Sequence, residues 1–283
     1  MKLIVTSVLI TCILCAKGQS QGGLILISDQ FSFAEGPAVD SKGNIYFTDQ
    51  PNNKIWKYTS EGKLDVFLES AGRSNGLYID KDDHIIACAD EKNELWRIAP
   101  SGNVEVLLDQ YNGRKFNGPN DVWISPAGGC YFTDPHYQRE YWTRKGKEIE
   151  EEALYLFQGG ILTQVDPDFI KPNGIVGTAD GRLLYVADIR ADKTYVYDID
   201  EKGNLVNKKL FCNQGSDGMT IDQKGNVYLT GKGVTIYNVQ GQKIHHIDVP
   251  ANWTANVCFG GKEKEYLFIT ASEKIFKIYP DWL

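Results

Sequence analysis

The sequence of 283 residues contains little of what nucleic-acid-binding and membrane-spanning chains require. Its 30 Lys and Arg are outnumbered by 37 Asp and Glu, which gives a net charge of −7. An acidic chain has no basic surplus with which to displace counterions from phosphates, so we expect no nucleic-acid partner. The apolar run at residues 3–16 is too short for a membrane-spanning helix, and we expect no membrane partner. With 2 Met beside 28 Gly, 15 Tyr, 12 Phe and 6 Trp, the composition also disfavours a helical bundle.

Residues 1–18 have the pattern of a secretory signal peptide. Lys2 provides a positive start, an apolar stretch follows, and the small residues Ala16 and Gly18 stand at the positions that signal cleavage requires. Cleavage before Gln19 would leave a mature chain of residues 19–283. We therefore expect an exported protein, either periplasmic or secreted.

The cysteines form no pattern for a zinc or redox site in the mature chain. Cys12 and Cys15 leave with the signal peptide, and no Cys-x-x-Cys pair remains after them. The other four lie in or beside apolar, strand-like runs, at Cys88, Cys130, Cys212 and Cys258. We expect buried free thiols, with a single disulfide as the alternative in an oxidising compartment.

A short unit rich in Asn, Asp and Gly recurs six times, and its starts are separated by 40, 45, 53, 44 and 39 residues. The six units are Glu35-Gly36-Pro37, Asn75-Gly76-Leu77, Asn120-Asp121-Val122, Asn173-Gly174-Ile175, Asp217-Gly218-Met219 and Asn256-Val257-Cys258. Each unit is followed by a turn and an apolar run, then by a third and, in most repeats, a fourth strand-like run. Four short strands in about forty residues are typical of one blade of a β-propeller.

The repeat predicts an all-β, six-bladed β-propeller that forms a single domain over residues 19–283. The sixth unit ends after its third strand, whereas residues 24–28 have strand composition and no blade of their own. We expect this N-terminal strand to supply the missing outer strand of the last blade. The ring would then be closed with no open sheet edge.

The residue that opens each unit is expected to project toward the central channel, because the first strand of a blade lines it. In chain order these residues are Glu35, Asn75, Asn120, Asn173, Asp217 and Asn256. They could simply open turns, but two acids among amides also form a hard, oxygen-only ligand set. Such a set favours Ca²⁺, with Mg²⁺ or Mn²⁺ as competitors, whereas Zn²⁺ is more usually held by His or Cys.

Strand parity places the connections between second and third strands on the same face as this ring. The connection at residues 135–153 is the longest of them. Its length indicates either a lid or binding loop, or an exposed loop without a function. It contains His136 and Tyr137, which we take as candidate substrate contacts. Arg190, in the fourth blade's connection, is a further candidate because it could pair with a carboxylate or phosphate. Asn75 and Asn120 complete the candidate substrate-binding set.

Four of these motifs together resemble the gluconolactonase and regucalcin (senescence marker protein) family of six-bladed propellers. They are Glu35-Gly36-Pro37, Asn120-Asp121, Pro172-Asn173-Gly174 and Ser216-Asp217-Gly218-Met219. The stretch Thr133-Asp134-Pro135-His136-Tyr137 is similar to the Thr-Asp-Pro-Pro-Tyr stretch of the family's bacterial lactonases, with His136 replacing a proline. The resemblance covers residues 33–279, although the arginine that stands beside the Asn-Asp unit in animal members is not matched.

The resemblance implies a lactonase of sugar acids with one divalent metal ion. The metal would be Ca²⁺ first, with Mg²⁺, Mn²⁺ or Zn²⁺ as alternatives, at the positions matching Glu35, Asn173 and Asp217. The match at Asn120 implies a further ligand or a substrate contact. The substrate would be a small-molecule lactone, and related propellers include diisopropyl fluorophosphatases.

We assign catalysis to Asp217, which would ligate the metal and orient or deprotonate the attacking water, while the metal polarises the lactone carbonyl. Glu35 and Asn173 would be plain ligands. Three alternatives remain open: a hydrolase of phosphoesters or organophosphates on the same site, a non-catalytic propeller that binds calcium or a carbohydrate, and a strictosidine-synthase-like propeller. The last would need a catalytic Glu elsewhere in the channel, and the sequence offers none.

Overall fold

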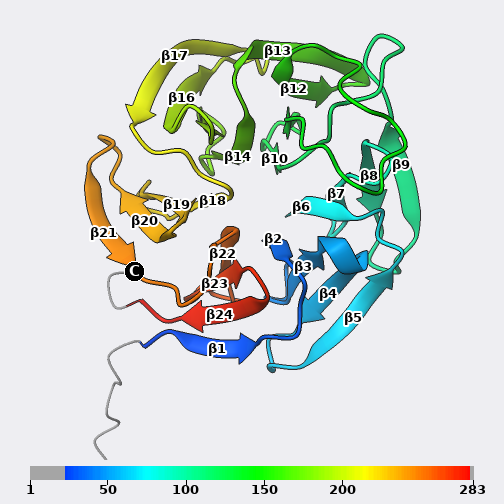
Figure 1. Cartoon of the computed structure of the whole chain (residues 1–283). Helices are drawn as coiled ribbons and strands as arrows, with labels where there is room; N and C mark the ends of the chain where they lie inside the picture. The colour runs from blue at the N-terminus through cyan, green and yellow to red at the C-terminus, as the bar shows by residue number, and fades with distance from the viewer. Residues whose placement is uncertain (1–22, 281–283) are drawn as a thin grey trace, which may run out of the picture.

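The computed structural model describes residues 23–280, and the predicted signal peptide at residues 1–18 lies outside them. Six four-stranded antiparallel sheets stand around a central axis like the blades of a propeller (Figure 1). The described residues contain no α-helix, and their one helical turn is the 3₁₀ segment η1 (Gln50–Asn52). The predicted all-β, six-bladed architecture is confirmed. Among the same residues there is no helix with the length and apolar character needed to cross a bilayer.

Within each blade the strands follow the chain outward from the axis. Blade 1 contains β2 (Ala34–Val39), β3 (Ile45–Asp49), β4 (Lys54–Tyr58) and β5 (Leu64–Glu69), and blade 2 contains β6 (Ser74–Ile79), β7 (Ile85–Ala89), β8 (Glu94–Ile98) and β9 (Val104–Leu108). Blade 3 contains β10 (Val122–Ile124), β11 (Cys130–Asp134), β12 (Glu152–Gln158) and β13 (Ile161–Phe169), and blade 4 contains β14 (Pro172–Gly177), β15 (Leu183–Asp188), β16 (Lys193–Ile199) and β17 (Leu205–Cys212). Blade 5 contains β18 (Met219–Ile221), β19 (Val227–Gly231), β20 (Gly233–Tyr237) and β21 (Lys243–Ile247).

The last blade closes the ring with both ends of the described chain. Its sheet consists of β22 (Asn256–Gly260), β23 (Tyr266–Ala271), β24 (Lys274–Ile278) and the N-terminal strand β1 (Ile25–Ser28). Ile25 of β1 pairs with Lys277 of β24, and the two strands lie side by side in Figure 1. The predicted closure is confirmed, although the strand begins at Ile25 and not at residue 24.

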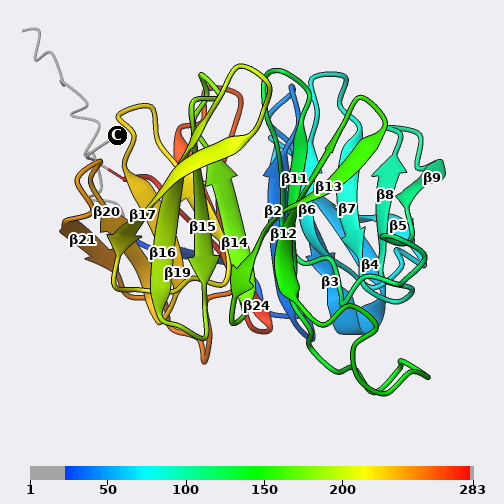
Figure 2. The same ribbon diagram turned by 90° about the horizontal axis from the view of Figure 1, so that it is seen from above.

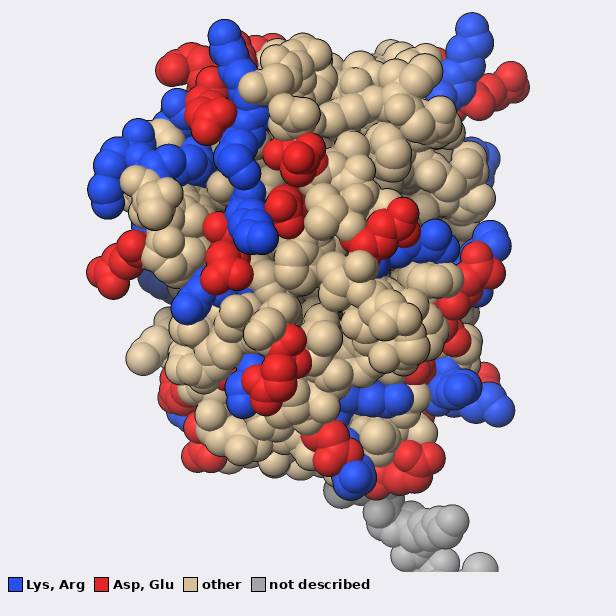
Figure 3. All heavy atoms as spheres, turned by 90° about the vertical axis from the view of Figure 1, so that its right-hand side faces the viewer, with Lys and Arg blue, Asp and Glu red and all other residues tan. Residues whose placement is uncertain are grey.

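Burial follows the position of each strand in its blade. Every residue of β3 and β7 is buried, because the inner strands of one blade pack between the two neighbouring blades. Outer strands such as β9 are exposed or half-buried along their length. Figure 3 shows acidic and basic side chains intermingled on the side of the ring that carries β9. The four cysteines expected to be buried free thiols, Cys88, Cys130, Cys212 and Cys258, are buried and unpaired.

The connection between β11 and β12 departs from its predicted bounds. β12 begins at Glu152, and Ala153 pairs with Asp134 of β11, so the connection spans residues 135–151 and ends two residues earlier than expected. Figure 2 shows it extending beyond the strand ends, at the same end of the ring as η1. This end is the one from which the first strand of each blade starts, and we call it the site face.

The seam between blades 1 and 6 gives a stability test of the ring closure. The buried Phe268 of β23 lies 5.6 Å from the ring of Phe47 and 5.8 Å from that of Tyr58, both in blade 1. We expect Phe268→Ala to lower the free energy of unfolding by about 3–5 kcal/mol, measured by urea denaturation. The control Ile161→Ala, at an exposed position, should change it by less than about 0.5 kcal/mol. A loss below about 1 kcal/mol for Phe268→Ala would show that this seam is not closely packed.

Candidate active site

The six residues that open the repeats all lie at the site-face end of the innermost strands. Five are buried, and Asp217 is half-buried just before β18. Close approach of the inner strands brings them together, and glycine in the repeat permits it. A Cβ on Gly218 would stand 1.8 Å from Cγ of Asn256, and one on Gly76 would stand 2.1 Å from Oδ1 of Asp121. In these two units the narrow centre of the channel therefore requires glycine.

Asp217 is held from two sides. The side-chain nitrogen of Asn173 donates to its Oδ1 at 2.8 Å, and the indole nitrogen of Trp253 donates to its Oδ2 at 2.5 Å. The same nitrogen of Asn173 also lies 3.0 Å from the hydroxyl of Tyr137. Since Asn173 uses its side-chain nitrogen in these contacts, its side-chain oxygen is available to bind a cation or a substrate. The structure thus brings together three of the predicted site residues, Asn173, Asp217 and Tyr137.

Glu35 forms a second group deeper in the channel. Its Oε2 accepts the backbone N–H of Gly36 at 2.6 Å and the side-chain nitrogen of Asn256 at 3.2 Å. Asn256 also lies 3.4 Å from both carboxylate oxygens of the buried Asp121. Asn256 therefore stands between two carboxylates and donates to both.

Burial raises the pKa of all three carboxyl groups, and repulsion from neighbouring carboxylates adds to the shift of Glu35 and Asp121. Burial is the largest cause for Glu35, whose pKa lies well above its usual value, and the charges of Asp217 and Asp121 add to the shift. Burial and the charge of Asp217 raise the pKa of Asp121 to about 8. Burial raises the pKa of Asp217 to about 6, while the hydrogen bonds from Trp253 and Asn173 and the charge of Arg139 act in the opposite direction. The channel centre is thus a site of concentrated, poorly compensated negative charge.

This donor set fits a divalent cation. Buried like charges are costly unless a cation offsets them, and carboxylate and amide oxygens are the ligands that Ca²⁺ prefers. Among residues 23–280 no three His, Cys, Asp or Glu side chains form a metal cluster by themselves. A set formed by Glu35 and Asp217 would therefore need a neutral oxygen as well, such as the side-chain amide oxygen of Asn173. Asn120, buried just before β10, is placed in the same ring.

The other predicted substrate contacts make no hydrogen bond or ion pair with Asp217 among residues 23–280. Asn75 is buried in β6, and its backbone oxygen accepts the hydroxyl of Thr48. The ring of His136 packs 5.8 Å from that of Trp142, and its backbone N–H binds Glu152 at 3.0 Å. Arg190 is exposed in the connection between β15 and β16. Of the predicted substrate-side residues, Tyr137 is the one that contacts the Asn173–Asp217 pair.

Sequence reasoning missed two residues of the site. Asp121 immediately follows Asn120 in the Asn–Asp unit, so the repeat marked its position although we gave a role only to Asn120. Trp253 lies in the irregular connection between β21 and β22, where no periodicity singles out a residue. Its role depends on a contact across 36 residues of sequence and could not be read from spacing.

A cavity of about 640 Å³ occupies the opposite end of the channel. Its walls include the apolar side chains of Leu77, Trp123 and Phe259, and Asp121 and Asn256 also line it. Glu35, Asn173 and Asp217 do not line this cavity. The candidate active site is therefore the site-face end of the channel, where the carboxylates converge.

Comparison with known proteins agrees with the fold. A family model described as the SMP-30/Gluconolactonase/LRE-like region matches residues 33–273. A gluconolactonase of Zymomonas mobilis is 28% identical and covers 89% of this chain and 80% of its own length. The structure of a gluconolactonase from Xanthomonas campestris is 24% identical, with a TM-score of 0.84 over 90% of this chain and 89% of that one. A calcium-binding regucalcin from Agrobacterium tumefaciens is 17% identical, with a TM-score of 0.75 over 91% and 95%. These two structures are similar to this chain in fold.

Proposed function

Because the chain belongs to the SMP-30/gluconolactonase/LRE-like family, we infer that it is a hydrolase of carboxylic esters that opens lactones. We propose that its substrates are lactones of sugar acids and that the reaction depends on one divalent cation, Ca²⁺ in the first place. The cation would be held by Glu35, Asn173 and Asp217, with Asn120 as a further ligand. The observation that carries this proposal is the pairing of Asp217 with Asn173 at a channel end crowded with carboxylates.

Asp217 is suited to accept a proton from water. Without a bound cation its pKa of about 6 lies below neutral pH, so the carboxylate form predominates and can accept a proton, and a cation at the same carboxylate would favour that form further. Trp253 and Asn173 each bind one of its oxygens and hold the carboxylate in a fixed orientation. A divalent cation, when bound, would supply Lewis-acid polarisation of the lactone carbonyl.

The bonds formed and broken and the proton transfers are those of ester hydrolysis. Water forms a bond to the lactone carbonyl carbon as Asp217 takes its proton. The ring C–O bond then breaks, and the same proton passes to the departing ring oxygen, which becomes a hydroxyl. The product is the open-chain hydroxy acid. Tyr137, which hydrogen-bonds to Asn173, would form part of the wall against which the substrate lies.

Parallel assays of a lactone and an organophosphate test this function. With Ca²⁺ present, we expect δ-gluconolactone to be opened at least about 100-fold faster than without enzyme, whereas a dialkyl fluorophosphate is turned over poorly. Chelation should remove the lactonase activity and re-addition of Ca²⁺ should restore it. Preferential cleavage of the organophosphate would favour the alternative hydrolase, and absence of turnover on both would favour a non-catalytic calcium-binding propeller.

We also propose that residues 1–18 are removed as a signal peptide and that the mature chain acts in the periplasm or outside the cell. The positive start, the apolar run and the small residues before Gln19 support this proposal. N-terminal sequencing of the protein recovered from its producing cells tests it. Recovery of the chain with Met1 intact would contradict export by this route.

A further inference from the structure

Asp90 stands one residue beyond the position at which the blade repeat uses aspartate. In blades 1, 3 and 4 the second strand ends in Asp49, Asp134 and Asp188, and each carboxylate accepts two backbone N–H groups from the segment that leads into the first strand. In blade 2 that position is held by Ala89, which pairs with Ser74 as Asp49 pairs with Ala34. The repeat therefore does not account for a carboxylate at position 90.

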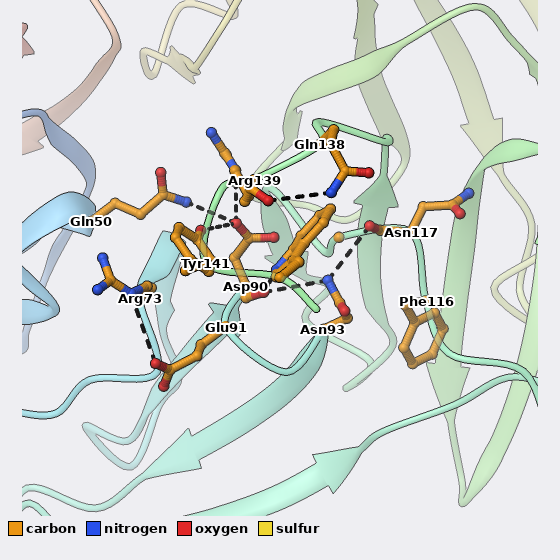
Figure 4. A network of polar contacts seen from close by, with 12 residues as sticks. Gln50, Arg73, Asp90, Glu91, Asn93, Phe116, Asn117, Gln138, Arg139 and Tyr141 are labelled. Carbon is orange, nitrogen blue, oxygen red and sulfur yellow. Dashed lines mark hydrogen bonds and ion pairs between the residues drawn. The ribbon is translucent and has the colours of Figure 1, made fainter. Parts of the chain in front are cut away.

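The carboxylate of Asp90 binds side chains of the long β11–β12 connection instead of backbone. It is 3% exposed, and its Oδ2 accepts the hydroxyl of Tyr141 at 2.5 Å and Nε of Arg139 at 2.9 Å. Gln50 of η1 donates to the same oxygen at 3.3 Å, and Trp142 donates to the backbone oxygen of Asp90 at 2.7 Å. Figure 4 shows these groups converging on Asp90. The connection is thus fastened to blade 2 and forms a fixed wall of the site.

Stability alone is a weak reason for this arrangement. Burial raises the pKa of Asp90 even though Arg139 and Tyr141 favour its charged form. A buried ion pair recovers little of the free energy spent in removing its charges from water. What the pair does achieve is to fix the guanidinium of Arg139 in one place.

Arg139 is fixed beside the residues assigned to catalysis. Its guanidinium carbon lies 5.5 Å from the ring centre of Tyr137, whose hydroxyl contacts Asn173. The positive charge of Arg139 lowers the pKa of Asp217. Among residues 23–280, Nε is the only nitrogen of its guanidinium group with a hydrogen-bond partner, and the side chain is 26% exposed. Figure 4 shows the terminal nitrogen directed away from Asp90. Arg139 therefore presents unused donors at the mouth of the site.

We propose that Arg139 is a substrate-binding residue that donates hydrogen bonds to the ring hydroxyl groups of a polyhydroxylated lactone, and that Asp90 is the residue that positions it. This inference rests on the proposed lactonase function. A guanidinium can only donate, so it selects oxygen acceptors. The reacting carbonyl lies at Asp217, so the groups that reach Arg139 are the substituents at the far side of the ring. Arg139 then confers preference for sugar lactones over unsubstituted ones.

Two lactones that differ in their hydroxyl groups test the proposal. Steady-state kinetics of Arg139→Gln, Arg139→Lys and the wild type are compared on δ-gluconolactone and on δ-valerolactone, which has no ring hydroxyl. We expect Arg139→Gln to lower kcat/KM for gluconolactone by about 10- to 100-fold and for valerolactone by less than about 3-fold. Arg139→Lys should fall between, because it keeps the charge and loses the planar fork. Asp90→Asn should raise KM for gluconolactone by about 3- to 10-fold with a smaller change in kcat.

The matched control is Arg182→Gln, which removes an arginine whose Nε binds an aspartate at 2.6 Å on an exposed turn away from the site. It should leave both substrates unaffected. An equal loss on both lactones, or unchanged kinetics on gluconolactone by folded Arg139→Gln and Arg139→Lys proteins, would overturn the role of Arg139 while leaving the lactonase function intact. Absence of turnover of either lactone by the wild type would overturn the proposed function and this inference with it.

Discussion

An Asp217→Asn protein is expected to lose lactone hydrolysis almost completely, with a fall in kcat of about 1,000-fold or more. The reason is that asparagine keeps the shape of the side chain but cannot accept the proton of the attacking water, a contribution of about 100- to 10,000-fold in general-base catalysis. The hydrogen bonds to Asn173 and Trp253 would also be rearranged, since a carboxylate oxygen becomes an amide group. Initial rates at saturating Ca²⁺ and gluconolactone measure the effect.

The control for this variant is Asp180→Asn, at an exposed turn where the carboxylate binds Thr178 and Arg182. It should retain the wild-type kcat. Melting temperatures of both variants establish that they are folded. Near-normal turnover by Asp217→Asn with metal bound would show that another group accepts the proton, and the catalytic assignment would be wrong.

Glu35→Gln is expected to weaken the binding of the metal ion and to leave kcat at saturating metal concentration nearly unchanged. Glu35 is a buried carboxylate that no arginine or lysine neutralises through a contact in the described chain, so its charge is available to a cation. Removing it should raise the Kd for Ca²⁺ at least about 10-fold, measured by calorimetry, and kcat should recover when Ca²⁺ is supplied in excess. Unchanged affinity would remove Glu35 from the ligand set, and lost kcat at saturating metal would give it a direct catalytic part.

The buried carboxyl groups are expected to make the free energy of unfolding of the metal-free protein fall as the pH rises. The pKa of Asp121 is raised from 3.8 to about 8 and that of Asp217 from 3.8 to about 6, so the folded chain holds protons that the unfolded chain has released. Stability from these groups is therefore fully present below about pH 4 and is lost as the pH rises through 6 and 8. Ca²⁺ should raise the Tm of the chelated protein more at pH 8 than at pH 5. An equal rise at both values would indicate that the cation does not meet these carboxylates.

The fold could be predicted from the sequence because each blade repeats one register. A unit such as Asn173-Gly174-Ile175 recurs at the start of every inner strand, and the strands that follow are marked by alternating apolar residues. Closure by β1 could be predicted by counting strands, since the sixth blade lacked an outer strand and the N-terminal strand had no blade of its own. The ring of channel residues was predictable for the same reason: a residue at a fixed place in each repeat must point to one axis.

The substrate side of the site could not be predicted in this way. Trp253, Arg139 and Asp90 lie in connections, where position depends on contacts between segments distant in sequence and not on periodicity. The β11–β12 connection illustrates this. Its length was compatible with a lid or with an exposed loop of no function. The hydrogen bonds to Asp90 hold it in place at the side of the site. Those contacts exist because the repeat's aspartate is replaced by Ala89 and a carboxylate follows one residue later, a shift that spacing alone did not mark as functional.

The central claim, that the site-face end of the channel is a calcium-dependent lactonase site, is tested most directly by a crystal structure of the protein with Ca²⁺ and a sugar-acid lactone. We predict one calcium ion with the side-chain oxygens of Glu35, Asn173 and Asp217 at about 2.3–2.6 Å. We also predict that the lactone carbonyl lies on the Asp217 side and that the ring hydroxyls point toward Arg139. Calcium and lactone bound in the cavity at the opposite end of the channel, or no calcium at saturating concentration, would contradict the claim.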